Sequence, residues 1–355
     1  MSVLSSIVQL VVALSVLIIL HEIGHFIAAR ITKVEVEEFG LGYPPRALTL
    51  FEINGTKYTL NWLPLGGFVR LKGEVDADTP GGLHTANPWA RLFIYAAGPI
   101  MNFLVGVLIF AFMYTQTGAP DYTKVEIVGV ASGSPAEQIG LQDGDIITGV
   151  AGITVDSTQI LSETIYANLG KDIDFSFRRG EADYEVSIVP RENPPEGEGA
   201  IGIIMSNATY PINIFEALPL GGQATYYHTL FLLMIPGEII RGAIDPGLAR
   251  PVGYKGIYDA YQYVQQRDEP LTDSPVSLNV LQFFASISIS LAVFNLLPIP
   301  ALDGGRIAFT LPEIFLRRRI PIEWQNVINL ISMTALIALF LYINFLDFAN
   351  PIQFP

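Results

Sequence analysis

The feature that most constrains this chain is an apolar run at its start that is long enough to cross a membrane. The eighteen residues from Val3 to Leu20 include only four polar ones, Ser5, Ser6, Gln9 and Ser15. A membrane-spanning helix needs about 17–25 residues of this kind. A signal peptide has a basic region before its apolar core and a cleavage site of small residues after it. This run has neither feature, so we expect a retained helix rather than a signal peptide.

The run ends in the sequence His21-Glu22-Ile23-Gly24-His25, which has the form H-E-x-x-H. Residues four apart lie on one face of a helix, so His21 and His25 point the same way. Two imidazoles placed like this can hold one zinc ion, and Glu22 beside them can act as a general base toward water. Ionisable residues at membrane depth are costly and indicate function, whereas the simpler alternative is a helix end that has reached the interface.

Three further segments fit membrane spans: Leu92–Tyr114, Leu278–Ile299 and Val327–Phe345. Charged residues make up 15% of the chain, against about 25% in soluble proteins. We therefore predict a polytopic α-helical membrane protein with four transmembrane helices. The second span carries small or polar residues at four-residue spacing, Gly98, Asn102 and Gly106. Such a face allows another helix to pack closely, and its asparagine could instead hydrogen-bond across the helix interface.

A β-hairpin is predicted between the first two spans. Runs rich in β-forming residues, Ala47–Ile53 and Thr56–Leu63, flank Asn54-Gly55, which is the strongest short hairpin signal. We expect this hairpin to be membrane-associated, with a small soluble ribbon as the alternative. An exposed hairpin edge could capture an unwound substrate by strand addition, so Asn54 and Gly55 are candidate substrate-binding residues. The polar stretch after it reads as a linker, in which His84 is expected to be solvated.

Residues 121–191 differ from the rest, because they are charged, rich in strands and turns, and free of membrane-length runs. A capping box over Ser134–Glu137 starts a short helix. A strand over Ile146–Val150, a helix over Thr158–Asn168 and two further strands over Ile173–Arg178 and Tyr184–Val189 follow. The segment resembles a circularly permuted PDZ domain of bacterial proteases, on Gly133-Ser134-Pro135-Ala136-Glu137, Gly140-Leu141 and Gly144-Asp145-Ile146-Ile147. PDZ domains bind extended peptides by strand addition, so a peptide ligand is expected.

Residues 192–277 are predicted to form a linker and interfacial amphipathic helices. Ile212–Ile244 is apolar but interrupted, and its uninterrupted part is too short for a span. His228 in this segment is expected to be interfacial rather than a metal ligand.

The third span ends abnormally, in the sequence from Asn295 to Gly305, where two prolines and two glycines must break the helix. Broken backbone at membrane depth is tolerated where it is buried in protein or lines a cavity. A catalytic zinc needs three protein ligands, and Asp303 is the only carboxylate in this stretch. Asp303 is therefore the candidate third ligand, with an interfacial turn residue as the alternative and Glu238 as a weaker candidate.

Basic residues predict the orientation in the membrane. Lys and Arg are concentrated in the short loop between the first two spans and in the loop between the last two, and none precedes the first span or follows the fourth. Cytoplasmic loops carry this excess, so both loops are expected in the cytoplasm and residues 121–191 outside. The metal site would then lie toward the cytoplasmic side of the cell membrane.

The chain resembles the site-2 protease family of intramembrane zinc metalloproteases, particularly bacterial PDZ-containing members that cut anti-sigma factors. The resemblance rests on His21 to His25, Gly98 to Phe103, the PDZ-like segment, Arg250 to Gly253 and Asn295 to Gly305. It implies that His21, His25 and Asp303 bind Zn²⁺, that Glu22 is catalytic and that Asn295 lies near the substrate. Residues 1–115 and 278–350 would form two halves of a membrane protease core. The implied substrates are transmembrane segments of single-pass proteins, of the anti-sigma-factor or signal-peptide type.

Two other functions compete with this interpretation. One is a membrane-anchored PDZ adaptor with a vestigial metal site, and the other is a transporter, because broken spans also line transport sites. The net charge of −14 argues against a nucleic-acid partner, which would require a basic surface. The chain has no cysteine, which excludes disulfides and thiolate metal ligands.

Overall fold

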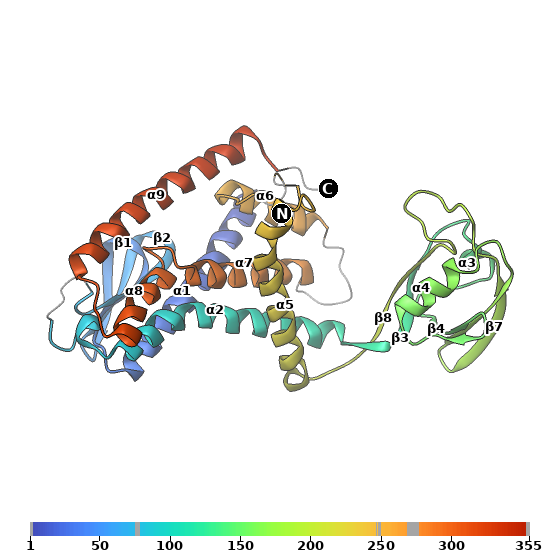
Figure 1. Ribbon diagram of the computed structural model, residues 1–355, viewed down its shortest axis with the longest axis horizontal. Helices are drawn as coiled ribbons and strands as arrows, with labels where there is room; N and C mark the ends of the chain where they lie inside the picture. Colours follow the sequence, from blue (N-terminus) through green and yellow to red (C-terminus); the bar gives the residue numbers. More distant parts are fainter. Residues whose placement is uncertain (1–2, 75–78, 246, 248–249, 268–276, 353–355) are drawn as a thin grey trace. The chain divides into compact units, whose positions relative to one another are not determined.

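The structure is a computed structural model that describes residues 3–74, 79–245, 247, 250–267 and 277–352 (Figure 1). The chain divides into two compact units. We call Met1–Met113 together with Leu218–Pro355 the helical unit, and Tyr114–Ala217 the inserted unit.

Four helices in the described residues are long and apolar enough to cross a membrane: α1 (Val3–Ile31), α2 (Pro88–Thr117), α7 (Leu278–Leu296) and α9 (Ile322–Ala349). They coincide with the four predicted spans. Helix α7 ends at Leu296, before the two prolines, and a new helix, α8 (Asp303–Leu316), begins after them. The predicted break therefore separates two helices and leaves Asp303 at the start of the second.

The helical unit also contains the 3₁₀ turn η1 (Leu83–Thr85) and the helices α5 (Ile214–Ile240) and α6 (Tyr254–Gln266). Helix α5 runs continuously through the glycines and prolines that led us to expect interruptions. Gly221 lies against α2, where a Cβ atom would come within 2.4 Å of the Val107 carbonyl oxygen. This close approach is typical of helices that pack through small residues. The interfacial location of α5 stays a prediction.

Helix α6 is anchored to the C-terminal part of α9. Its N-cap residue, Gly253, offers no side chain to accept from the first turn. The buried carboxylate of Asp347 in α9 accepts instead, from the backbone N–H groups of Gly253 at 2.8 Å and Gly256 at 2.9 Å. Arg250 also pairs with Asp347, at 3.3 Å. A carboxylate at a helix N-terminus satisfies unpaired amides and complements the helix dipole, so α9 supplies the missing cap.

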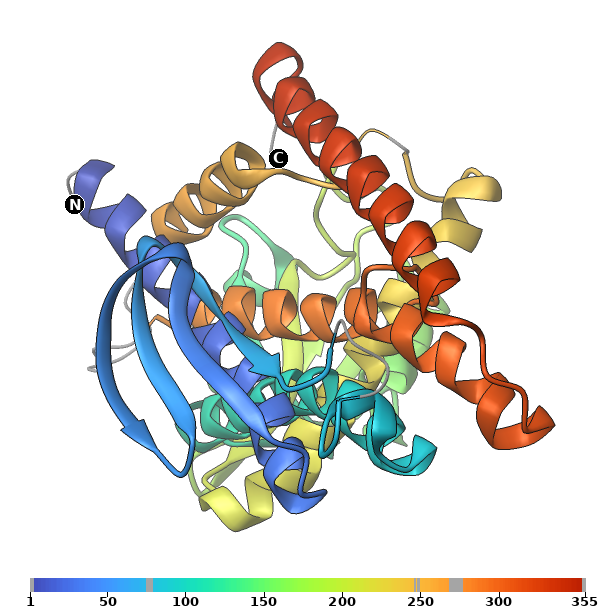
Figure 2. The same cartoon turned by 90° about the vertical axis from the view of Figure 1, so that its left-hand side faces the viewer.

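Strands β1 (Val36–Ile53) and β2 (Thr56–Leu71) form an antiparallel sheet connected by the predicted turn, with Asn54 and Gly55 both at positive φ. The sheet is larger than the predicted hairpin over Ala47–Leu63. Residues 36–41 pair with 67–71 on one side and with 57–60 on the other. The stretch 67–71 is therefore an edge, and it lies beside α1 (Figure 2).

A buried carboxylate stabilises this sheet. Glu38 is 3% exposed, and it accepts hydrogen bonds from Arg46 at 2.7 Å, Thr59 at 2.7 Å and Arg70 at 3.0 Å. Burial alone would raise the pKa of Glu38, but the hydrogen bonds from Arg46 and Thr59 and the nearby positive charges outweigh it and lower the pKa below its usual 4.5. The ionised form therefore stabilises the folded sheet.

We expect Glu38→Gln to lower the free energy of unfolding at pH 7 by about 1.5–3 kcal/mol, the usual contribution of a hydrogen bond to a charged group. Because the folded pKa lies below the unfolded one, this stabilisation is present above pH 4.5 and is lost as pH falls through the folded pKa. Unfolding of detergent-solubilised protein, followed by tryptophan fluorescence, measures it. The exposed neighbour Glu37→Gln is the control. An acid-dependent loss of stability as steep in Glu38→Gln as in the wild type would contradict the assignment.

The inserted unit is built around one sheet with strand order β7-β6-β4-β3-β8, and β5 pairs with β4. A buried apolar cluster that includes Val125, Ile147, Leu161 and Phe175 forms its core. Its elements are β3 (Ala119–Val130), α3 (Pro135–Gln138), β4 (Ile146–Val150), β5 (Ile153–Thr154), α4 (Thr158–Tyr166), β6 (Ile173–Arg179), β7 (Ala182–Ile188) and β8 (Ile203–Tyr210). Ser134 caps α3 by accepting from the Glu137 N–H, as the capping box predicts.

The sheet continues past the boundary that we predicted at Arg191. Strand β8 pairs with β3 along most of its length, from Val130 opposite Ile203 to Ala119 opposite Tyr210. Residues 203–210 therefore belong to this sheet rather than to a linker. Strand β8 lies at one edge of the sheet order, a position at which another strand can be added.

Candidate metal centre

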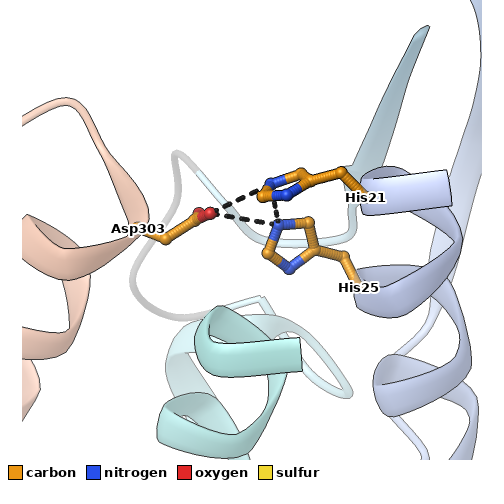
Figure 3. Close-up of side chains that lie close together, drawn as sticks. All are labelled: His21, His25 and Asp303. Atoms are coloured by element: carbon orange, nitrogen blue, oxygen red, sulfur yellow. Dashed lines mark hydrogen bonds and ion pairs between the residues drawn. The ribbon is translucent and has the colours of Figure 1, made fainter. Parts of the chain in front are cut away.

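The two motif histidines lie on one face of α1, as their four-residue spacing predicts. His21 is 7% exposed and His25 is 9% exposed. Their Nε2 atoms lie 3.1 Å apart, and both rings point away from the helix toward the start of α8 (Figure 3). The lone pairs of two imidazole nitrogens buried this close together repel each other. The arrangement is therefore unfavourable unless a proton or a metal ion lies between the two nitrogens.

Asp303 completes the group, although 282 positions separate it from His21. Its Oδ2 lies 3.2 Å from His21 Nε2 and 3.3 Å from His25 Nε2. Tetrahedral ligands at the usual zinc distance of 2.0–2.1 Å are about 3.3 Å from one another. All three separations, 3.1, 3.2 and 3.3 Å, fit that value. Among the described residues this is the group of histidine and acidic side chains able to hold a metal ion.

The far side of each imidazole is also fixed. His25 Nδ1 donates to the Ile94 carbonyl oxygen at 2.7 Å, which places the proton on Nδ1 and leaves the Nε2 lone pair for a metal. His21 Nδ1 lies 3.3 Å from the side-chain amide of Asn102, whose Oδ1 is buried and has no partner in the described structure. Turning that amide over gives His21 Nδ1–H an acceptor and pairs the orphaned oxygen. Asn102 thus contacts another helix, and it does so at the metal group.

Gly98 of α2 leaves room for the imidazoles. A Cβ atom at Gly98 would lie 2.3 Å from His25 Nε2 and 2.7 Å from His21 Nε2. On α1, directly before His25, a Cβ atom at Gly24 would lie 2.3 Å from the Ala97 carbonyl oxygen. The two helices therefore cross at a pair of glycines, and this crossing brings both histidines against α2.

We expect Gly98→Ala to displace the imidazoles and to lower zinc affinity by about 10–100-fold, as loss of ligand orientation does in metal enzymes. Zinc content after dialysis against a graded chelator measures the effect. Gly222→Ala in α5 is the control, because a Cβ atom there contacts nothing within 4 Å. Unchanged zinc affinity in Gly98→Ala would show that the imidazoles do not need this space.

Glu22 links the metal group to the sheet edge. Its Oε2 accepts from the Val69 N–H at 3.1 Å, so Oε1 is the candidate proton acceptor. A cavity of about 520 Å³ surrounds these groups, and its lining includes both histidines, Asp303, Glu22 and Asn295. The cavity therefore brings a candidate base, the candidate metal ligands and a polar amide to one space.

Two predicted substrate-binding residues are not part of this cavity. Asn54 and Gly55 lie in the turn between β1 and β2, and neither is in the cavity lining. The strand edge that borders the cavity is instead Phe68–Leu71. The hairpin signal correctly located the turn, but the long strands fold back and bring their other end to this cavity.

The remaining candidates lie outside the metal group. His84 was expected to be solvated, but it is 9% exposed, and its ring bonds to the Glu74 carbonyl oxygen at 3.0 Å. Its burial lowers the pKa of His84, so the ring is held neutral.

His228 packs against Phe110 of α2, with ring centroids 6.4 Å apart. Glu238 pairs with Arg241 at 3.0 Å. None of the three is a metal-ligand candidate in the described structure.

Comparison with known proteins decides the family. The family model of peptidase family M50 matches residues 9–339 of the chain. The chain belongs to peptidase family M50. This membership confirms the resemblance to site-2 proteases and the prediction that the chain is a protease. With the four apolar helices, it also identifies this M50 peptidase as an integral membrane protein.

Related proteins match over nearly their full length. "Putative zinc metalloprotease CPE1693" from Clostridium perfringens is 29% identical over 341 residues, which are 96% of this chain and 97% of that protein. "Zinc metalloprotease RasP" from Shouchella clausii is 26% identical and covers 98% of this chain and 99% of its own. Their names agree with the predicted zinc cofactor. A solved PDZ domain of the SdrC-like protein from Listeria monocytogenes is 25% identical, covers 24% of this chain and 88% of its own, and has a TM-score of 0.22.

Proposed function

We propose that this M50 peptidase is a zinc-dependent intramembrane endopeptidase that cleaves transmembrane segments of single-pass membrane proteins. In this proposal His21, His25 and Asp303 hold Zn²⁺, and Glu22 is the general base. The observation that carries it is the triangle of three buried donor atoms, 3.1–3.3 Å apart, supplied by helices from opposite ends of the chain. An adaptor with a vestigial metal site would not need to maintain these distances.

The chemistry divides between the metal and the chain. When bound by His21, His25 and Asp303, zinc would supply a Lewis acid that polarises a carbonyl and acidifies water. Glu22 accepts the proton of the water as it attacks the carbonyl carbon, and then delivers that proton to the leaving amide nitrogen. The bond from Val69 N–H holds one carboxylate oxygen, so the other is oriented for both proton transfers. The Ile94 carbonyl holds the ring of His25, and the Asn102 side-chain amide holds the ring of His21. Both rings therefore keep Nε2 directed at the metal position.

Substrate binding needs an extended backbone, because a helix hides its amides in its own hydrogen bonds. The edge strand Phe68–Leu71 borders the cavity and can pair with an unwound segment by strand addition. Asn295 lines the same cavity from the end of α7 and is suited to bond to the backbone of the bound segment. Asn54 and Gly55, at the far turn, have no such part in this proposal.

The inserted unit is proposed to be the PDZ domain. A peptide would add to the edge strand β8, beside α4, and the partner is a protein segment rather than nucleic acid. The basic loops support a cell-membrane location with this unit outside and the metal group toward the cytoplasm. The lipid bilayer then surrounds the four apolar helices.

Co-expression with single-pass membrane proteins tests the proposal. Wild-type protein should remove the full-length form of at least one partner, including anti-sigma factors or signal peptides among the candidates, and Glu22→Gln should not. Equal loss of the partner with both forms would refute the base, and zinc binding without cleavage of any single-pass protein would favour the adaptor.

A further inference from the structure

Helix α9 carries a polar residue, Asn329, that the proposed chemistry does not use. It lies within a candidate membrane span whose only fully buried residue in the described structure is Asp347, near the other end. A polar side chain in a span is costly and indicates a specific partner. Asn329 has one: its Oδ1 accepts a hydrogen bond from the backbone N–H of Ala301 at 3.0 Å.

Ala301 lies two positions before the metal-ligand candidate Asp303. Its φ of 75° is in the left-handed region, which a residue with a Cβ atom adopts only when its surroundings impose it. Ala301 also lines the active-site cavity. Its conformation therefore needs an outside constraint, and the hydrogen bond to Asn329 supplies one.

The turn that contains Ala301 is tightly packed onto the start of α8. A Cβ atom at Gly304 would lie 2.1 Å from the Leu297 carbonyl oxygen, and one at Gly305 would lie 2.3 Å from the Ile299 carbonyl oxygen. Within the turn, Leu302 N–H donates to the Ile299 carbonyl at 3.1 Å. The start of α8 has no freedom to adjust separately, so a change in the backbone at Ala301 moves Asp303.

We propose that Asn329 is a positioning residue for Asp303, and that α9 thereby forms part of the metal centre although it supplies no ligand. The hydrogen bond from Ala301 joins the turn before α8 directly to α9. The inference rests on the proposed role of Asp303 as a zinc ligand. Without the bond from Asn329, Ala301 relaxes toward negative φ and the carboxylate moves away from the two imidazoles.

The test measures zinc affinity of the full-length protein in detergent, by competition between Zn²⁺ and a chelator, without reference to activity. Asn329→Leu, similar in size but unable to accept a hydrogen bond, should lower zinc affinity about 10-fold, at the lower end of the effect of partners around metal ligands. Asn329→Ala repeats the test with a side chain that cannot clash, in case the leucine variant does not accumulate.

Asn344→Leu is the matched control. Asn344 lies on the same helix and also accepts from a backbone N–H, that of Tyr254 at 3.0 Å. It is fifteen residues from Asn329, about 22 Å along the helix, and its partner is α6 rather than the turn before Asp303. Asn344→Leu should keep wild-type zinc affinity, which separates positioning of Asp303 from a general loosening of α9.

Ala301→Gly provides the rescue, because glycine adopts positive φ without cost. Combined with Asn329→Leu it should restore most of the lost affinity. Wild-type affinity in Asn329→Leu or Asn329→Ala, an equal loss in Asn344→Leu, or no recovery with Ala301→Gly would each overturn the positioning role. Equal zinc binding by wild type and Asp303→Ala would instead refute the proposed metal site itself, so the two failures are distinguishable.

Discussion

The Glu22→Gln protein should retain zinc and lose peptide cleavage by about 10²–10⁴-fold, the range typical of a missing general base. Glutamine has the size of glutamate and can still accept from Val69 N–H, so the sheet edge should keep its place. It cannot take a proton from water. Because Glu22 is not one of the three metal-ligand candidates, zinc content should stay at the wild-type level.

Purified protein in detergent, a single-pass substrate and a zinc assay on the same samples measure both quantities. Glu37→Gln, an exposed carboxylate on β1, is the control and should leave cleavage unchanged. Cleavage by Glu22→Gln at more than about a tenth of the wild-type rate would exclude the assigned base. Loss of zinc together with activity would show that Glu22 acts on the metal site instead.

Asp303→Ala should lower zinc affinity by more than about 100-fold, because loss of a ligand exceeds the 10–100-fold effect of losing a partner around the ligands. The substitution removes one of three donors. Only the two imidazole nitrogens, 3.1 Å apart, then remain to bind the ion. Peptide cleavage should disappear with the metal. Competition between Zn²⁺ and a chelator gives the affinity directly.

Asp259→Ala is the control for a lost carboxylate, since Asp259 pairs with Lys255 on α6 and has no part in the metal group. Addition of zinc in excess should partly restore metal binding to Asp303→Ala and should not change Asp259→Ala. If Asp303→Ala binds zinc as tightly as the wild type, the third ligand lies elsewhere.

Sequence patterns were sufficient where local chemistry determines structure. Apolar length predicted the four spans, and the prolines and glycines after Asn295 predicted the break that leaves Asp303 at the start of α8. Helical spacing placed His21 and His25 on one face. The Asn-Gly pair marked the turn between β1 and β2. In each case the deciding interaction lies within a few residues along the chain.

The sequence was insufficient where distant segments meet. Strand β8 follows a proline- and glycine-rich linker, and only its pairing with β3 assigns it to the inserted sheet. His84 is buried because its ring bonds to a backbone carbonyl, which no residue type reveals. Val69 and Ile94 act at the centre through backbone atoms and so have no sequence signal. Asn329 does carry a sequence signal, because it is a polar residue in an apolar span. Its partner is the main-chain N–H of Ala301, which no residue type reveals.

The most direct test of the central claim is X-ray absorption at the zinc edge on the purified wild-type protein, with His21→Ala and Asp303→Ala beside it. We expect one zinc per chain, bound by two imidazole nitrogens and at least one oxygen, with one imidazole fewer in His21→Ala and little bound zinc in Asp303→Ala. A zinc environment without imidazole, or one that neither substitution changes, would contradict a metal centre built from α1 and α8.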